Sequence, residues 1–207
     1  MTATRLLWSL AEELERAAVV AALNRFTCTD ARPGARSKSW RDVTPAWWEY
    51  EVQGAIRDLR PPFGVHGRTL RLGYDQQGLA AVCHMEEVDG PGQVELALIA
   101  VERRLRGTGH LFADETVAEA LDDITGRAIE AGVDEVLVQA YVWHQNVASR
   151  ALCARQGMAR TGDTGEGVEV WSVLLDTRLD EQEEAADVRA FDAALAEGGP
   201  NIPLDEV

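Results

Sequence analysis

The sequence predicts one α/β (α+β) domain, a mixed and mostly antiparallel sheet flanked by helices, followed by an acidic C-terminal tail. Stretches with the alternation of strands are interleaved with stretches of helical periodicity over residues 1–179. Short turn sequences such as Asp89-Gly-Pro-Gly92 join strand candidates, which is typical of an antiparallel meander. With 46% apolar residues, the 207-residue chain can also bury a core. We therefore expect one domain over 1–179 and a tail over 180–207.

The N-terminal third is predicted to be mainly helical. Leu6, Leu10 and Leu14 recur at helical spacing, and Arg60-Pro-Pro-Phe-Gly64 cannot continue a helix. The expected elements are a helix over Thr4–Asn24, a short strand over Arg25–Thr29, a basic loop over 30–45 and a second helix over Ala46–Leu59.

The rest of the domain alternates strands and helices. The expected strands are Thr69–Tyr74, Leu79–Val88, Val94–Val101 and 135–142, with a final hairpin of Met158–Thr161 and Val168–Leu175. The expected helices are 110–131, which ends at Gly132, and 146–156. In the first of these helices Phe112–Thr116 is interpreted as an insertion or a kink, and the inward face is predicted to be Leu111, Val117, Leu121, Ile124 and Ala128.

The acidic tail carries about half of the net charge of −15. Residues 180–207 hold nine acidic residues against one basic residue, Arg189, which gives −8. A short helix over Glu183–Ala196 is expected there, and two interpretations stay open. It is a loosely packed helix followed by disorder, or its stripe of Val188, Phe191 and Leu195 docks on the body or on a second subunit.

Charge and composition exclude several classes of function. A strongly acidic protein repels nucleic acid and anionic membranes, so neither is an expected partner, whereas cationic amines are favoured. No apolar stretch approaches the ~20 residues that span a bilayer. Cys28, Cys83 and Cys153 are too few and too far apart for a disulfide framework or a zinc site. A cytoplasmic protein without a metal is expected, as a monomer or a homodimer.

The turn after the Val94–Val101 strand is the most informative segment. Arg103, Arg104 and Arg106 stand beside Gly107 and Gly109, just before the helix that starts near His110. Helix-start amides have no intrahelical partner, the helix dipole is positive there, and glycine lets a ligand approach the backbone. The residues therefore predict a site for a polyphosphate.

Two motifs resemble the acyl-CoA site of the GNAT acetyltransferase superfamily. Arg104-Leu-Arg106-Gly107-Thr108-Gly109 is similar to the family motif Arg/Gln-x-x-Gly-x-Gly/Ala. Downstream, Asn146-Val-Ala-Ser149-Arg-Ala-Leu152-Cys153-Ala-Arg155-Gln-Gly157-Met158 resembles Asn-x-x-Ala/Ser-x-x-Leu-Tyr-x-Lys/Arg-x-Gly-Phe. The resemblance covers roughly residues 66–175 and implies the GNAT fold with acetyl-CoA as cofactor. The residues implied to bind it are Ile99, Val101, Arg104, Leu105, Arg106, Gly107, Thr108, Gly109, His110, Asn146 and Ser149.

The resemblance also implies catalytic roles. Glu95, six residues before the end of its strand, stands where histone-type members carry a glutamate base, and His84 and His144 are the alternatives. The family's tyrosine acid is replaced by Cys153. Either Cys153 donates the proton, or Tyr141 or water does, or the thiolate leaves without an acid. Cys153 is also interpretable as a small buried apolar residue.

The acceptor side is implied to lie in residues 30–65, where aromatic residues are frequent. These side chains either hold an amine cation or belong to the core; they are Trp40, Trp47, Trp48 and Tyr50, with Glu51 as a possible carboxylate partner.

The predicted function is an acetyl-CoA-dependent N-acetyltransferase that acts on an amine of a small molecule or a protein. The alternative is a CoA-binding regulatory or interaction module without turnover, which the replacement of tyrosine by Cys153 favours.

Overall fold

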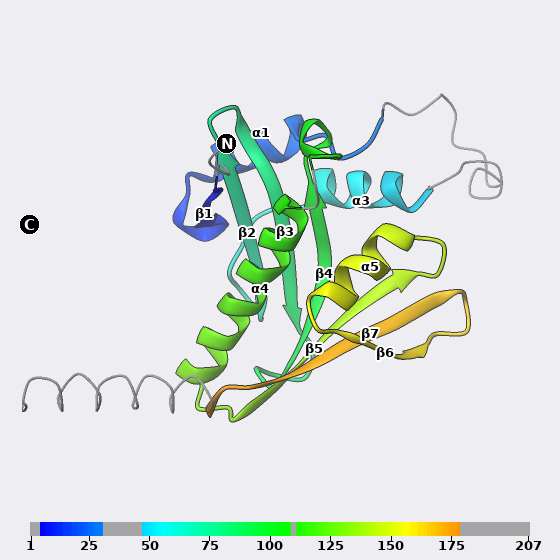
Figure 1. The fold of residues 1–207 in the computed structure, drawn as a ribbon. Helices are drawn as coiled ribbons and strands as arrows, with labels where there is room; N and C mark the ends of the chain where they lie inside the picture. Colours follow the sequence, from blue (N-terminus) through cyan, green and yellow to red (C-terminus); the bar gives the residue numbers. More distant parts are fainter. Residues whose placement is uncertain (1–4, 31–46, 109–110, 179–207) are drawn as a thin grey trace, which may run out of the picture.

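The computed structural model describes residues 5–30, 47–108 and 111–178 (Figure 1). Most of the predicted basic loop, Gly109 and His110 of the predicted cofactor site, and the predicted tail helix lie outside the described residues. A seven-stranded sheet has the order β1-β2-β3-β4-β5-β7-β6. The strands are β1 (Leu7–Leu10), β2 (Arg68–Asp75), β3 (Gly78–Glu87), β4 (Gln93–Val101), β5 (Glu135–Trp143), β6 (Ala159–Asp163) and β7 (Val168–Asp176). The helices are α1 (Arg16–Arg25), α3 (Trp47–Asp58), α4 (Leu111–Glu130) and α5 (Val147–Arg155), with two short 3-10 turns, η1 (Ala11–Glu13) and η2 (Arg103–Leu105).

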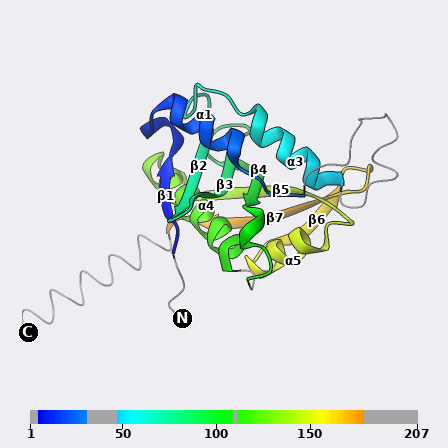
Figure 2. The ribbon, with the colours of Figure 1, turned by 90° about the horizontal axis from the view of Figure 1, so that it is seen from above.

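The sheet confirms the predicted mixed and mostly antiparallel class. Every neighbouring pair is antiparallel except β4 and β5, which are parallel and are connected through α4. Helices α1 and α3 cover one face of the sheet, and α4 and α5 cover the other (Figure 2). The strands from Thr69 onward, both C-terminal helices and the final hairpin are found where the sequence predicts them, within one or two residues in most cases.

The N-terminal helix prediction is wrong in its first half. Residues 7–10 form edge strand β1, which pairs with β2 from Leu7↔Tyr74 to Leu10↔Arg71. The spacing of four residues between the leucines also fits a strand, because residues separated by an even number of positions lie on the same face of a strand. Helix α1 begins only at Arg16, where the side chain of Glu15 accepts hydrogen bonds from the amides of the first turn.

The predicted strand at Arg25–Thr29 is also absent from the described fold. Instead, Gln53 of α3 replaces a strand partner, since its side chain accepts from the Cys28 amide at 2.8 Å and donates to the Phe26 carbonyl at 3.0 Å. Gln53 is buried, so the segment is fixed against α3 by a side chain rather than by a sheet.

Helix α4 runs without interruption from Leu111 to Glu130, so Phe112–Thr116 belongs to one continuous helix. Val117, Ile124 and Ala128 are buried against the sheet as predicted. Arg71 of β2 anchors the helix through ion pairs to Glu119 and Asp123. In the described part of the chain, no helix has the length and apolar character needed to cross a bilayer.

Strand β4 contributes to the core on both faces of the sheet. Val94 and Leu96 pack with the α4 cluster, whereas Leu98 and Ala100 pack with the α1 and α3 cluster. The switch arises from a β-bulge, because the pairing moves from His84↔Leu98 to Glu86↔Glu95 and sets two β4 residues opposite one β3 residue. The bulge re-aims the strand immediately before the cationic turn.

Candidate functional site

A cavity of about 330 Å³ lies beside the C-terminal half of β4, beyond the last residue of β4 that pairs with β5. The two strands pair only from Gln93↔Leu137 to Glu95↔Gln139, and their remaining residues are not paired with each other. The C-terminal half of β4 lines the cavity through residues 99–101, and the following turn lines it through residues 105–107. The β4 residues that line the cavity therefore all lie beyond the end of the β4–β5 pairing.

The amides of Ile99 and Val101 are directed toward this gap. The Glu102 amide donates to Ala80 of β3 at 2.7 Å, and hydrogen-bonded positions alternate along an antiparallel pair. The backbone N–H and C=O groups of Leu98 and Ala100 therefore point toward β3, as the Glu102 amide does. Ile99 and Val101 turn their backbone groups to the opposite side, toward β5, and both residues line the cavity.

The turn after β4 brings backbone and glycine to the cavity. Gly107 has φ +78°, a left-handed conformation that favours glycine, and a Cβ at this position would meet no protein atom within 4 Å. The Thr108 hydroxyl donates to the Leu105 carbonyl at 2.6 Å and closes the turn on itself. Phe112 and Ala113 also line the cavity, so the positive end of α4 borders it.

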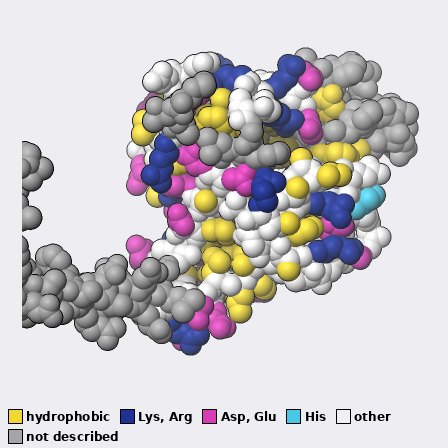
Figure 3. Space-filling model, in the orientation of Figure 1, with side chains coloured by type: hydrophobic (Ala, Val, Ile, Leu, Met, Phe, Trp, Pro, Cys, Tyr) yellow, Lys and Arg dark blue, Asp and Glu magenta, His cyan; other side chains and the backbone are white. Residues whose placement is uncertain are grey.

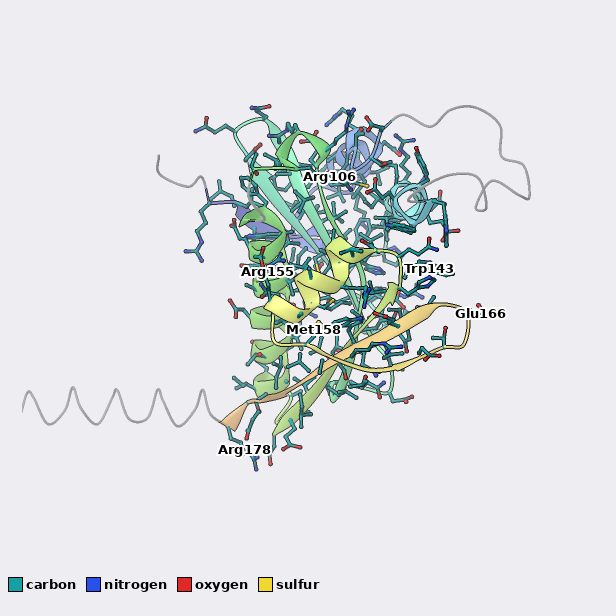
Figure 4. All side chains as sticks on the ribbon, turned by 45° about the vertical axis from the view of Figure 1, so that its right-hand side comes forward. Arg106, Trp143, Arg155, Met158, Glu166 and Arg178 are labelled. Atoms are coloured by element: carbon teal, nitrogen blue, oxygen red, sulfur yellow. The ribbon has the colours of Figure 1, made fainter. Side chains whose placement is uncertain are left out.

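Each of the three arginines of the turn is paired with an acid from another part of the chain. Arg103 pairs with Asp30, and Arg104 makes a two-pronged contact with Asp75 at 2.6 and 2.8 Å. Arg106 Nη1 lies 2.9 Å from Glu49 Oε1 of α3. Of the three, only Arg106 lines the cavity; its position on the turn is labelled in Figure 4. On the molecular face of Figure 3 basic and acidic side chains are likewise interspersed.

Helix α5 forms the second wall. The Asn146 side chain accepts from the Ser149 amide at 3.2 Å and caps the helix, and both residues line the cavity. Arg155, at the last turn of α5, adds a second cationic side chain to the lining and is held by Asp114 at 2.9 and 3.0 Å. Asn146 thus caps the helix and lines the cavity at the same time.

Helix α3 forms the third wall. Trp48, Glu49 and Val52 line the cavity. Trp143, labelled in Figure 4, lies at the end of β5. The ring of Trp47 packs edge-on against it, with centroids 4.6 Å apart, and so joins α3 to the second half of the sheet. Sequence reasoning selected Glu51 as the acidic residue of this segment, whereas Glu49 is the one that lines the cavity.

Glu95 lies in the paired part of β4 and does not line the cavity. Its Cα partner on β3 is Glu86, so the two carboxyl groups share one face of the sheet. Burial raises the pKa of Glu95, and the charge of Glu86 raises it further. His84 Nε2 lies 3.7 Å from Glu86, and burial lowers the pKa of His84.

His144, the other histidine considered as a base, contacts the Gly167 carbonyl through Nδ1 at 2.8 Å. Tyr141 is half-exposed.

Cys153 is buried in the cluster between α4 and the sheet, next to the cavity-lining Leu152. Burial raises the pKa of its thiol to about 11. A different cysteine, Cys28, lines the cavity from the α3 side, and burial raises the pKa of that thiol to about 11 as well.

Several lining residues were absent from the set predicted by sequence. Cys28 and Glu49 belong to the N-terminal third, where no motif is recognisable, and their proximity to the turn is created by the fold. Arg155 stands inside the second motif, at its Lys/Arg position, and that position could have indicated it.

No family model and no curated protein matches this sequence. Among solved structures, an acetyltransferase of the GNAT family from Staphylococcus aureus superposes with a TM-score of 0.52 at 11% identity, over 82% of this chain and 100% of that chain. The protein has the GNAT fold.

Two further GNAT-like structures match less closely. The spermidine/spermine N-acetyltransferase SpeG from Vibrio cholerae has a TM-score of 0.49 at 16% identity, over 84% of this chain and 96% of that chain. A ribosomal-protein alanine N-acetyltransferase from Escherichia coli has a TM-score of 0.48 at 13% identity, over 83% of this chain and 94% of that chain. In this chain's GNAT fold, the two motifs recognised in the sequence flank one cavity.

Proposed function

We propose that this protein is an N-acetyltransferase that moves an acetyl group from acetyl-CoA to an amine of a small molecule or a protein by direct attack on the thioester. The observation that carries the proposal is the cavity beside the part of β4 that is no longer paired with β5, which has a cationic glycine-containing turn on its border. Such a turn before a helix N-terminus suits a diphosphate, and a gap in the sheet suits an extended arm.

The residues around the cavity fit acetyl-CoA. Arg106 and Arg155 supply positive charge, and the space beside Gly107 leaves room for a ligand at the backbone. Asn146 and Ser149 offer polar groups on the α5 wall. In this proposal Arg104 and Thr108 position the turn, since their side chains contact Asp75 and Leu105, while Leu105, Arg106 and Gly107 face the cofactor. Gly109 and His110 complete the proposed set.

Acetyl-CoA supplies the activated acetyl group, and the protein polarises it. The amides of Ile99 and Val101 are the proposed donors to the thioester carbonyl oxygen. Preorganised donors of this kind contribute ~3 kcal/mol each to the barrier reduction. Because they belong to the backbone of a sheet strand, they need no rearrangement to act.

Glu95 is the proposed base for the amine proton. Burial and the charge of Glu86 raise its pKa, which makes it a stronger proton acceptor than an ordinary glutamate. It lies four positions before Ile99, about 13 Å along a strand, so the proton passes through water. The neighbouring His84 and Glu86 extend this polar surface.

Cys153 is the proposed proton donor to the departing thiolate. It follows the lining residue Leu152, and a pKa of about 11 keeps the thiol protonated at neutral pH. The burial of Cys153 in the core is at the same time the observation that favours the second candidate function, a CoA-binding module without turnover.

Two measurements on the purified protein test the proposal. Calorimetry with CoA should give a saturable 1:1 complex, and Arg106→Glu should weaken it at least tenfold through charge reversal. Thiol release from acetyl-CoA should then appear with at least one member of a panel of primary amines. CoA binding without thiol release on any amine supports the module, and absence of binding contradicts both functions.

A further inference from the structure

Building on the proposed function, we propose that Glu49 determines the acceptor class. Its carboxylate is held by Arg106 and is made available to a cationic amine when a phosphate group of the cofactor engages that arginine. The acceptor is accordingly a protonated amine with an apolar body, and the cofactor and the acceptor bind with positive coupling.

The position of Glu49 allows it both to pair with Arg106 and to bind a cationic amine in the cavity. It lies in the first turn of α3 and lines the cavity, with Oε1 2.9 Å from Arg106 Nη1. Its second oxygen, Oε2, accepts from the Thr29 hydroxyl at 2.8 Å. Because Thr29 is buried and holds the other oxygen, the carboxylate keeps its place when Arg106 turns to another anion.

Glu49 is distinctive in charge. It is the only acid among the described residues that line the cavity, beside Arg106 and Arg155. The acids that neutralise Arg103, Arg104 and Arg155 stand outside the lining, so a phosphate at those residues would leave no uncompensated carboxylate in the cavity. A phosphate at Arg106, in contrast, leaves the Glu49 carboxylate in the cavity without its cation, and this carboxylate then attracts a second cation.

The surroundings of Glu49 favour an amine over an inorganic cation. Trp48 and Val52, from the same helix, line the cavity with it. An indole face attracts an ammonium group and also contacts the carbon chain attached to it. Among the residues described, no group of three or more acidic, histidine or cysteine side chains could hold a metal ion.

Because Glu49 and the cofactor phosphate compete for Arg106, one substitution at Glu49 should have opposite effects on the binding of the two ligands. Glu49→Gln keeps the shape and can keep the Thr29 hydrogen bond, but it removes the charge. CoA should bind about threefold more tightly, since an exposed ion pair contributes only that order of affinity. With saturating acetyl-CoA, the KM for a cationic primary amine should rise about tenfold, with a smaller change in kcat.

Asp30→Asn is the matched control, because it frees Arg103 on the same turn from an acid that does not line the cavity. Its CoA affinity and amine KM should equal those of the wild type. Glu49→Asp, which keeps the charge, should retain most of the amine affinity.

The outcomes separate this inference from the proposed function. If the wild type binds CoA and Glu49→Gln changes neither the CoA affinity nor the amine KM, Glu49 is a structural partner of Arg106 only, and the inference is overturned alone. If the wild type does not bind CoA, the proposed function fails and the inference fails with it.

Discussion

Glu95 is a carboxyl group whose ionisation the fold opposes. Burial and the neighbouring Glu86 both raise its pKa, so the folded state binds this proton more tightly than the unfolded chain does. Ionised Glu95 therefore lowers stability at pH values above its unfolded pKa, and that loss vanishes where both states are protonated. The melting temperature of Glu95→Gln should exceed that of the wild type at pH 7, and the difference should close toward pH 3.

The same substitution has a kinetic consequence if Glu95 is the base. Acetyl transfer by Glu95→Gln should fall about 100-fold at pH 7, where the amine is protonated, and much less at pH 9 to 10. The measurement is kcat/KM against pH for both proteins. Parallel profiles would remove Glu95 as the base and leave His84, its neighbour on the same sheet, as the next candidate.

Cys153 is tested by separating turnover from binding. Cys153→Ala should lower kcat about tenfold if the thiol protonates the departing thiolate, and should leave CoA affinity unchanged. The loss of a small buried side chain should also destabilise the fold by about 1 kcal/mol in urea unfolding. Destabilisation with an unchanged kcat would assign Cys153 to core packing alone.

The contact between α3 and β5 joins the helix that carries the cavity-lining Trp48, Glu49 and Val52 to the second half of the sheet. Trp143 packs against Trp47, and no other aromatic ring pair links these two elements among the described residues. Trp143→Ala should cost about 2 kcal/mol in urea unfolding and weaken CoA binding severalfold, because α3 loses its hold on the second half of the sheet. Trp143→Phe should recover most of both effects.

Tyr141, on the same strand but half-exposed, provides the control. Tyr141→Ala should change stability by less than about 0.5 kcal/mol. Equal losses in Tyr141→Ala and Trp143→Ala would mean that strand propensity, rather than the ring contact with α3, sets the effect.

Elements were predictable where their determinants are local. Three segments fix the backbone through neighbours in sequence: the turn at Asp89–Gly92, the arginine- and glycine-containing turn after β4, and the helix start at Asn146. The structure has the expected elements around each of them. The prediction of the first helix failed because its determinant is not local. Residues 7–10 become a strand because β2, more than 55 residues later, offers a free edge, and periodicity alone does not reveal that partner.

The cavity likewise combines residues that local motifs indicate with residues that only the whole fold brings together. The backbone side of the site, from Ile99 to Gly107 and from Asn146 to Ser149, was accessible from two motifs. The pairing of Arg106 with Glu49 joins residues 57 positions apart, and that of Arg104 with Asp75 joins residues 29 apart. An arginine-rich segment therefore indicated an anion site, but the acids that balance it appear only once α3 and β2 are in place.

Charge at the scale of the whole molecule yields the last prediction. Residues 180–207 contribute −8 to the net charge of −15, whereas all seven strands and both helical layers are complete within residues 5–178. Deleting 180–207 should leave a cooperative melting transition within about 3 °C of that of the full chain. For a cationic amine, kcat/KM at low salt should fall about two- to threefold, and its salt dependence should become shallower, because a weaker negative field attracts the amine less.

A neutral-pH ionic-strength series on both proteins, with CoA saturating, measures that salt dependence directly. Identical slopes would mean that the tail does not act on the acceptor through its charge. A lost or strongly shifted melting transition would instead mean that residues 180–207 pack on the body, as the stripe of Val188, Phe191 and Leu195 permits. The two outcomes are independent, because field effects disappear at high salt whereas apolar packing does not.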